Sequence, residues 1–144
     1  MGLVIRDAVE GDFEGIWLLN KNAFGYDYDV DGTRERVKFI LGKVDNKIFI
    51  AELDGVVVGY AHAADYECTY SESLKNILAI AVDETQRNKG IGRALLDAVE
   101  QWAKETGSVG VRLVSGFNRE KAHKFYLACG YFDRKDQKNF MKLF

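Results

Sequence analysis

The sequence of 144 residues lacks proline and contains only two cysteines and two histidines. Cys68 and Cys129 are too few for a disulfide framework and do not have the spacing of metal ligands, so we expect a reduced protein with no metal site. No low-complexity tract, internal repeat or shift in composition marks a domain boundary. One domain over residues 1–144 is therefore expected, and the 47% of apolar residues can fill its core.

An excess of charge of one sign is also absent. The 20 basic and 22 acidic residues give a formal net charge of −2, which creates no overall field for nucleic acid or an anionic membrane. The basic clusters at 119–124 and 134–142 are interleaved with acidic residues and lack a base-stacking aromatic array. No apolar run approaches membrane-spanning length, and the N-terminus lacks the features of a signal peptide. We expect a cytoplasmic monomer or homodimer that binds no nucleic acid and no membrane.

The apolar residues follow both strand and helix periods, which predicts a mixed α+β fold. Strands are expected at 3–6, 47–53, 56–65, 77–82, 109–115, 131–133 and 139–143. Helices are expected at 13–23, 33–43, 91–103 and 119–129. Asp12 is the expected N-cap of the first helix, and Asp54-Gly55 is the signal of a two-residue hairpin turn. Gly59 is expected where a neighbour or a bulge needs space.

The stretch 77–103 combines a predicted strand, a polar loop with two glycines and an amphipathic helix. Gly90 and Gly92 allow the backbone to turn tightly and to approach a ligand closely. The first amides of the helix have no internal partner and lie at its positive end, which suits a phosphate group. Three basic residues add positive charge around the same loop: Arg87, Lys89 and Arg93.

Three phosphate-binding motifs can be compared with this loop. A P-loop requires Gly-Lys-Ser/Thr, which is absent, and the dinucleotide motif requires a third glycine where this chain has Leu95. The remaining pattern, Arg87-x-x-Gly90-x-Gly92 after a strand, resembles the acetyl-coenzyme A pyrophosphate loop of the GNAT superfamily of N-acetyltransferases. The alternative is a helix start that contains glycine and is surrounded by solvated basic residues.

A second motif lies downstream, after the predicted strand at 109–115. Residues 118–131 read Asn-x3-Ala-x2-Phe-Tyr-x3-Gly-Tyr, which resembles the second GNAT signature position by position. Asn118 is the expected N-cap of this helix, and Gly130 is its expected C-cap. With both motifs present, the chain resembles members of the GNAT superfamily over nearly its whole length. The resemblance implies the acyl-CoA N-acyltransferase fold, a mostly antiparallel central sheet flanked by helices, with two strands splayed apart around the pantetheine arm.

The resemblance implies direct transfer of an acetyl group from acetyl-CoA to a primary amine of a small molecule or peptide. It also implies a set of cofactor-binding residues: Ile80, Ala81, Val82, Arg87, Asn88, Lys89, Gly90, Ile91, Gly92, Arg93 and Asn118. Within this set, the amide of Ile80 is expected to face the thioester oxygen. The family often has proline and glycine where this chain has Glu84 and Asn88, so we expect a slightly altered loop. Asn88 tolerates left-handed backbone geometry.

Tyr126 is the expected general acid by the same resemblance. A phenol with a pKa of about 10 remains protonated at neutral pH and can donate a proton to the leaving thiolate. The alternative for Tyr126 is a core aromatic on a helix face. The general base is left open between water and four residues on or after the third strand: His62, Asp65, Glu67 and Glu72. The alternative function is a sensor or regulatory module that binds acetyl-CoA without turnover, and Tyr126 argues against it.

The link between the first two helices is acidic and aromatic. Two rings and three carboxylates follow one another there: Tyr26, Asp27, Tyr28, Asp29 and Asp31. Carboxylates in the link would attract a cationic amine, and the rings could contact its charge. The alternative is an exposed turn, because Asp favours turns for local reasons.

Overall fold

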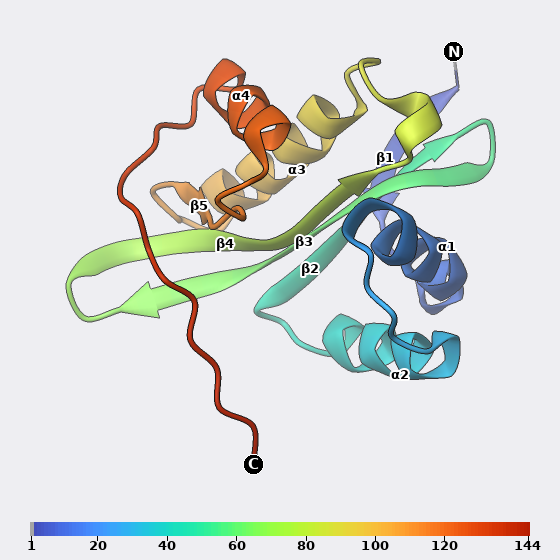
Figure 1. Ribbon diagram of the computed structural model, residues 1–144, viewed down its shortest axis with the longest axis horizontal. Coiled ribbons are helices and arrows are strands. Elements are labelled where there is room, and N and C mark those ends of the chain that lie inside the picture. Colours follow the sequence, from blue (N-terminus) through green and yellow to red (C-terminus); the bar gives the residue numbers. More distant parts are fainter. Residues whose placement is uncertain (1) are drawn as a thin grey trace. The chain divides into compact units, whose positions relative to one another are not determined.

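The computed structural model describes residues 2–144, and the chain divides into two compact units, Met1–Val114 and Ser115–Phe144. The first unit contains five strands and three α-helices, and the second contains one α-helix followed by an extended chain (Figure 1). No helix within residues 2–144 has the length and apolar character needed to cross a membrane.

The sheet of the first unit has five strands in the order in which they occur in the sequence. They are β1 (Leu3–Asp7), β2 (Asn46–Leu53), β3 (Val56–Cys68), β4 (Ser71–Val82) and β5 (Val111–Leu113). The first four strands pair in antiparallel fashion, and β5 pairs with β4 in parallel. A mostly antiparallel sheet with flanking helices confirms the predicted fold class.

Two tight hairpins connect the central strands. Asp54 and Gly55 have φ values of 50° and 85°, the left-handed geometry that a two-residue hairpin turn requires, so the predicted turn is confirmed. The strand β3 extends to Cys68, and β4 begins at Ser71. The polar stretch between the predicted strands at 56–65 and 77–82 therefore forms a second hairpin. Exposed and half-buried side chains alternate along the end of β3, which explains its polar sequence.

Helices cover both faces of this sheet (Figure 1). The helices α1 (Phe13–Leu19) and α2 (Val30–Leu41) pack on the face that carries Ile48 and Ile50. The helix α3 (Ile91–Glu105) packs on the other face, where Trp102 meets the ring of Phe49 at a centroid distance of 6.4 Å. Neighbouring residues of a strand point to opposite faces, so the two cores are separated by the sheet itself.

The helix starts differ from the expected ones in detail. A short 3-10 turn, Glu10–Asp12, leads into α1, and Asp12 occupies the predicted N-cap position. The carboxylate of Asp12 does not bond the helix, because it instead accepts hydrogen bonds from Arg6 and from the amide of Val9. The helix α1 continues as a π-turn over Asn20–Phe24.

Gly59 lies where side chains of α3 approach the backbone of β3 closely. A Cβ atom there would be 3.0 Å from the carbonyl oxygen of Ala81 and 3.2 Å from Cδ1 of Leu95. The β2–β3 register also shifts beside it, between Ala51 and Glu52. Both parts of the expectation for Gly59, a close neighbour and a bulge, are confirmed.

The strands β4 and β5 pair over only three residues each and then separate. The last pair is Ile77 with Leu113, so the predicted strand at 109–115 is shorter than expected. Among the described residues, no strand pairs with residues 78–82 on this side of β4. On the other side, His62 pairs with Ala79 while Ala63 pairs with Ile77, so Leu78 is the extra residue of a bulge.

The second unit contains α4 (Glu120–Ala128). Its N-cap is Arg119, so the prediction of Asn118 at this position is wrong. The Arg119 amide donates to the carbonyl of Gly116, and this closes a turn that contains Asn118. The C-cap is Cys129, so the prediction of Gly130 at this position is also off by one residue, and Gly130 follows the cap with a left-handed φ of 91°.

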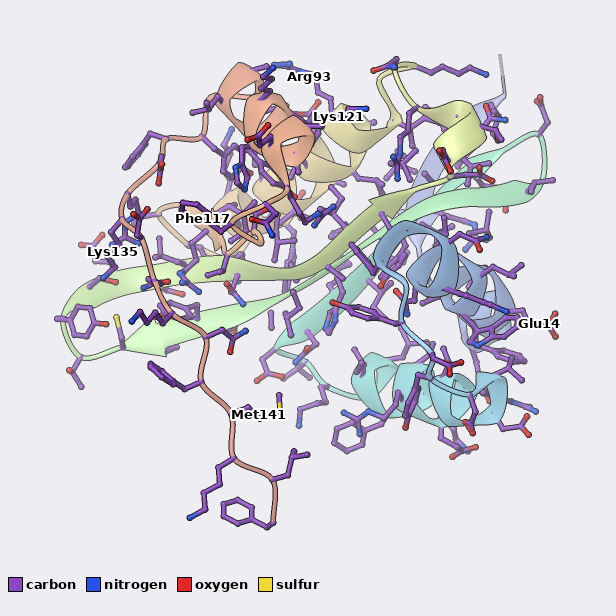
Figure 2. All side chains as sticks on the ribbon, in the orientation of Figure 1. Glu14, Arg93, Phe117, Lys121, Lys135 and Met141 are labelled. Carbon is purple, nitrogen blue, oxygen red and sulfur yellow. The ribbon has the colours of Figure 1, made fainter. Side chains whose placement is uncertain are left out.

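The predicted closing hairpin at 131–133 and 139–143 is wrong, because residues 131–144 contain no regular secondary structure. A two-stranded hairpin is marginal without further strands. The intervening residues 134–138 also lack the Asn-Gly or Asp-Gly pair that favours a tight turn. Figure 2 shows the side chains spread outward along this segment, with Met141 among them.

Candidate cofactor and acceptor sites

The loop between β4 and α3 is held in shape by its own polar residues. Asp83 accepts hydrogen bonds of 2.9 Å from both the amide and the hydroxyl of Thr85. Asn88 and Gly90 have φ values of 63° and 81°, so Asn88 adopts the left-handed geometry that asparagine tolerates. Gly90 is the N-cap of α3 and brings no side chain that could bond the helix amides.

The first turn of α3 therefore presents uncapped amides. The first intrahelical bond runs 3.0 Å from the amide of Ala94 to the carbonyl of Gly90. The amides of residues 91–93 precede it and have no partner within the helix. A Cβ atom built on Gly90 would meet nothing within 4 Å, so a ligand can approach the backbone here. This arrangement suits an anion.

The basic side chains around this helix start have no acidic partner within residues 2–144. Arg87, Lys89 and Arg93 are all exposed, and none of them forms an ion pair within residues 2–144. The ammonium group of Lys89 donates to the side chain of Gln86 at 2.8 Å. A pyrophosphate group would therefore meet amide donors and basic side chains together, which is the donor set that coenzyme A requires.

The unpaired side of β4 lies in the same unit. Ile80, Ala81 and Val82 pair with β3 on one side only. Ala81 is buried, and Ile80 and Val82 are half-buried. The amides of a pantetheine arm can add to such a strand edge as an extra strand would. The residues present therefore fit the second part of coenzyme A.

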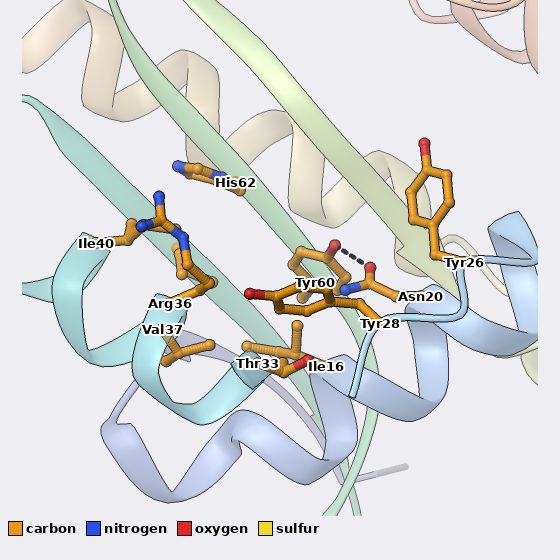
Figure 3. Close-up of a pocket in the computed structure, with 11 residues that line it drawn as sticks. Ile16, Asn20, Tyr26, Tyr28, Thr33, Arg36, Val37, Ile40, Tyr60 and His62 are labelled. Carbon is orange, nitrogen blue, oxygen red and sulfur yellow. Dashed lines mark hydrogen bonds between the residues drawn. The ribbon is translucent and has the colours of Figure 1, made fainter. Parts of the chain in front are cut away.

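A pocket of about 290 Å³ opens on the face of the sheet that α1 and α2 cover (Figure 3). Four aliphatic side chains line it: Ile16, Val37, Ile40 and Ile48. Its polar lining comes from both helices, the link between them and β3: Asn20, Tyr26, Tyr28, Thr33, Arg36, Tyr60 and His62. The phenol of Tyr60 donates to the side-chain oxygen of Asn20, and burial raises the pKa of Tyr60, so this phenol remains protonated.

The link between α1 and α2 is fixed over this pocket. The indole nitrogen of Trp17 donates to the backbone carbonyl of Tyr28 at 2.8 Å. Both rings of the link, Tyr26 and Tyr28, line the pocket. Its carboxylates do not, and Asp29 instead caps α2 by accepting from the amide of Gly32 at 2.7 Å. The expected rings therefore reach the pocket, while the expected carboxylates lie outside its lining.

His62 is the one base candidate from the sequence that lines this pocket. Its Nε2 lies 2.8 Å from the side-chain oxygen of Asn46. An amide oxygen only accepts, so Nε2 carries the proton and Nδ1 keeps its lone pair. Burial lowers the pKa of His62. Neutral imidazole is therefore the prevailing form at neutral pH.

The other three base candidates lie elsewhere. Asp65 accepts a hydrogen bond of 2.6 Å from Lys75, whose side chain is buried. Glu67 and Glu72 are exposed on the β3–β4 hairpin. Within residues 2–144, no group of three His, Cys, Asp or Glu side chains is placed to hold a metal ion.

The second unit holds the predicted acid. Tyr126 is buried in α4, with its ring centroid 5.4 Å from that of Phe125 and 6.1 Å from that of Tyr131. Burial raises the pKa of Tyr126, so its phenol carries a proton at neutral pH. Asn118 is exposed in the turn before α4. The roles of Tyr126 and Asn118 stay predictions.

The family of the chain follows from comparison with known proteins. The model of the acetyltransferase (GNAT) family matches residues 13–131. The chain belongs to the acetyltransferase (GNAT) family. By family, the chain is therefore classed as an acetyltransferase.

Individual GNAT relatives resemble the chain at moderate identity. An aminoglycoside N(6')-acetyltransferase of Stenotrophomonas maltophilia is 30% identical over 108 residues, which cover 72% of this chain and 71% of that protein. An uncharacterised N-acetyltransferase of Methanocaldococcus jannaschii is 25% identical over 111 residues, and the match spans 74% of this chain but only 48% of that protein. The structure of AAC(6')-Iy with a bisubstrate analogue superposes with a TM-score of 0.88 at 22% identity, covering 99% of both chains.

Proposed function

We propose that the protein transfers the acetyl group of acetyl-CoA directly to a primary amine of a small molecule or peptide. The observation that carries this proposal is the position of His62 on the sheet. His62 pairs with Ala79, beside the bulge at Leu78 where the free side of β4 begins. A base in the pocket is therefore one strand away from the edge that would hold the pantetheine arm.

The cofactor-binding roles in the proposed complex divide by segment. Amides of residues 88–93, with Arg87, Lys89 and Arg93, bind the pyrophosphate. The backbone of residues 80–82 pairs with the pantetheine arm, and the amide of Ile80 polarises the thioester carbonyl. Asn118 contributes a further hydrogen bond to this arm. The support for these roles is the uncapped start of α3 and the unpaired edge of β4.

In the proposed reaction, Nδ1 of His62 first takes a proton from the bound ammonium group. This step is required because a lysine-like amine has a pKa of about 10.4 and is protonated at neutral pH. The neutral amine then forms a bond to the thioester carbon, and the bond from that carbon to sulfur breaks. The phenol of Tyr126 donates its proton to the departing thiolate, and the resulting phenolate regains a proton from the bonded nitrogen, directly or through water, as the amide forms.

An acetylation screen tests this function. The protein is incubated with acetyl-CoA and one amine at a time, chosen from polyamines, aminoglycosides, aminoalkylphosphonates and peptides with free N-termini. We expect release of free coenzyme A that depends on the amine, together with an acetylated product in the mass spectrum. If acetyl-CoA binds but no amine increases release above the rate of hydrolysis, the protein is a sensor of the cofactor and the proposal fails.

A further inference from the structure

The pocket contains one charged group that the proposed transfer does not use, the guanidinium of Arg36. Arg36 lies on α2 and lines the pocket together with neutral side chains only (Figure 3). No carboxylate belongs to the lining, and burial keeps His62 mostly uncharged. The permanent charge of the pocket is therefore positive.

Arg36 also differs from the other arginines near it in having no acidic partner. Arg34, two residues earlier on the same helix, forms an ion pair of 3.3 Å with Glu10. Arg6 pairs with both Asp12 and Glu52. Within residues 2–144, Arg36 forms no ion pair, and its guanidinium carbon lies 4.9 Å from the ring centre of Phe39. Its hydrogen-bond donors are available to a ligand.

A second donor lies on the same side of the pocket. A Cβ atom on Gly32 would be 2.5 Å from Oδ1 of Asp29, the carboxylate that caps α2 and lies outside the pocket lining, 2.9 Å from Cε2 of Tyr28 and 3.0 Å from Cζ, the ring carbon that bears the hydroxyl. Arg36 follows Gly32 by one helical turn and therefore projects from the same face of α2. The Tyr28 hydroxyl makes no hydrogen bond within the described part of the chain. A phenol and a guanidinium thus line the same pocket, and neither has an acceptor within residues 2–144.

These two donors suit an anion. A guanidinium binds the oxygens of a carboxylate or a phosphate through two parallel hydrogen bonds, and a phenol adds a third. A second ammonium group would find no carboxylate in the lining and would be repelled by Arg36. The volume of about 290 Å³ suits a compact acceptor.

We propose that the acceptor is a small amine that also carries a carboxylate or phosphate group, which Arg36 and the hydroxyl of Tyr28 bind while the amine faces His62. This inference rests on the proposed acetyl transfer and names the substrate class of its acceptor pocket. It differs from the expectation of a cationic acceptor, which was based on the acidic residues of the link between α1 and α2. The carboxylates of that link lie outside the pocket lining.

Matched pairs of amines test the proposal. Phosphoethanolamine is compared with ethanolamine, β-alanine with β-alaninamide, and spermidine serves as a polycation. We expect the anionic member of each pair to have a kcat/KM at least about tenfold higher, equivalent to one charge-assisted contact. Arg36→Gln should reduce this preference by about the same factor, chiefly through KM, and Arg36→Lys should restore part of it. Arg34→Gln, on the same helix but outside the pocket lining, should leave the preference unchanged.

A binding measurement separates this inference from the proposed function. Phosphoethanolamine and ethanolamine are titrated calorimetrically into the protein with coenzyme A present. If phosphoethanolamine binds more tightly and Arg36→Gln removes the difference, but no amine is acetylated, the anion site stands and the transferase proposal fails. If amines are acetylated but ethanolamine or spermidine is preferred, or if Arg36→Gln leaves the preference within about twofold, the anion site is overturned while acetyl transfer stands.

Discussion

The side-chain oxygen of Asn46 lies 2.8 Å from Nε2 of His62, and the two residues belong to the adjacent strands β2 and β3. Asn46 thereby selects the tautomer that leaves Nδ1 free to accept a proton. The same imidazole has a pKa below its usual value because it is partly buried. One hydrogen bond and partial burial therefore keep the imidazole neutral with Nδ1 unprotonated, as the proposed reaction requires.

Replacing His62 with Gln should lower kcat by about 10²- to 10⁴-fold, which is the usual contribution of a general base. In the unmodified enzyme, kcat/KM should rise with pH along a limb centred below 6.5, because burial lowers the pKa of His62 from that value. The variant should lack this limb. The measurement is a pH profile of coenzyme A release at saturating acetyl-CoA.

His123→Gln is the matched control for this experiment. The Nε2 of His123 lies 2.9 Å from the backbone carbonyl of Gly116, and both residues belong to the second unit. Its kcat should remain within about twofold of the unmodified enzyme. If His62→Gln retains both its rate and the acidic limb, the base is another group or a water molecule.

The backbone of the candidate cofactor loop could be anticipated because its signals are local. The glycines of the loop, the basic residues around it and the left-handed geometry of Asn88 all depend on the residues next to them in the sequence. The hairpin at Asp54-Gly55 was predictable for the same reason. Local backbone chemistry therefore carries most of what the sequence could predict of the fold and the cofactor site.

The acceptor pocket could not be predicted in the same way, because its contacts join distant residues. Tyr60 donates to Asn20 across 40 positions of the sequence. In the sequence, Asn20 is only a polar residue at the end of an apolar helix face. Arg36 is only one of several charged residues in the sequence of its helix. The bulge at Leu78 falls inside a run that is apolar on both faces, so no alternation revealed it.

Asp12→Asn should destabilise the fold by about 1–3 kcal/mol, since it weakens hydrogen bonds between charged groups. Arg6 donates to both carboxylate oxygens of Asp12 at 2.9 Å, and the Val9 amide donates at 2.8 Å. Burial alone would raise the pKa of Asp12, but these bonds outweigh it and hold the pKa below 3.8. Urea denaturation near neutral pH measures the difference.

The pH dependence of this effect has a fixed sign. A carboxylate with a lowered pKa in the folded state stabilises the fold above the unfolded value, near 3.8, and loses this contribution as the pH falls through the folded value. The difference between Asp12→Asn and the unmodified protein should therefore shrink in acid. Asp97→Asn, which replaces an exposed carboxylate on α3, is the control for the denaturation measurement near neutral pH.

Tyr126→Phe keeps the ring and removes the proton donor, so kcat should fall by about 10²- to 10⁴-fold with little change in acetyl-CoA binding. The ring contacts with Phe125 and Tyr131 do not need the hydroxyl and should survive. Tyr70→Phe, in the exposed β3–β4 turn, is the control. If chemistry limits the rate and the kcat of Tyr126→Phe stays within about twofold of that of the unmodified enzyme, Tyr126 is a packing residue.

Gly90 and Gly107 form a matched pair at the two ends of α3. Each has a φ of 81°, and a Cβ atom on either would meet nothing within 4 Å. Substitution by alanine should therefore cost both variants a similar stability, about 1–2 kcal/mol for left-handed geometry. Thermal denaturation checks that the two costs agree.

The two variants should differ only in their affinity for acetyl-CoA. The methyl group of Gly90→Ala would occupy the space through which a pyrophosphate approaches the amides of residues 91–93, so the affinity should fall by at least about tenfold, or 1.4 kcal/mol. Gly107→Ala lies at the opposite end of the helix and should bind as the unmodified protein does. Calorimetric titration with acetyl-CoA measures both. If both variants lose the same stability but bind acetyl-CoA as tightly as the unmodified protein does, the pyrophosphate binds elsewhere than at the start of α3.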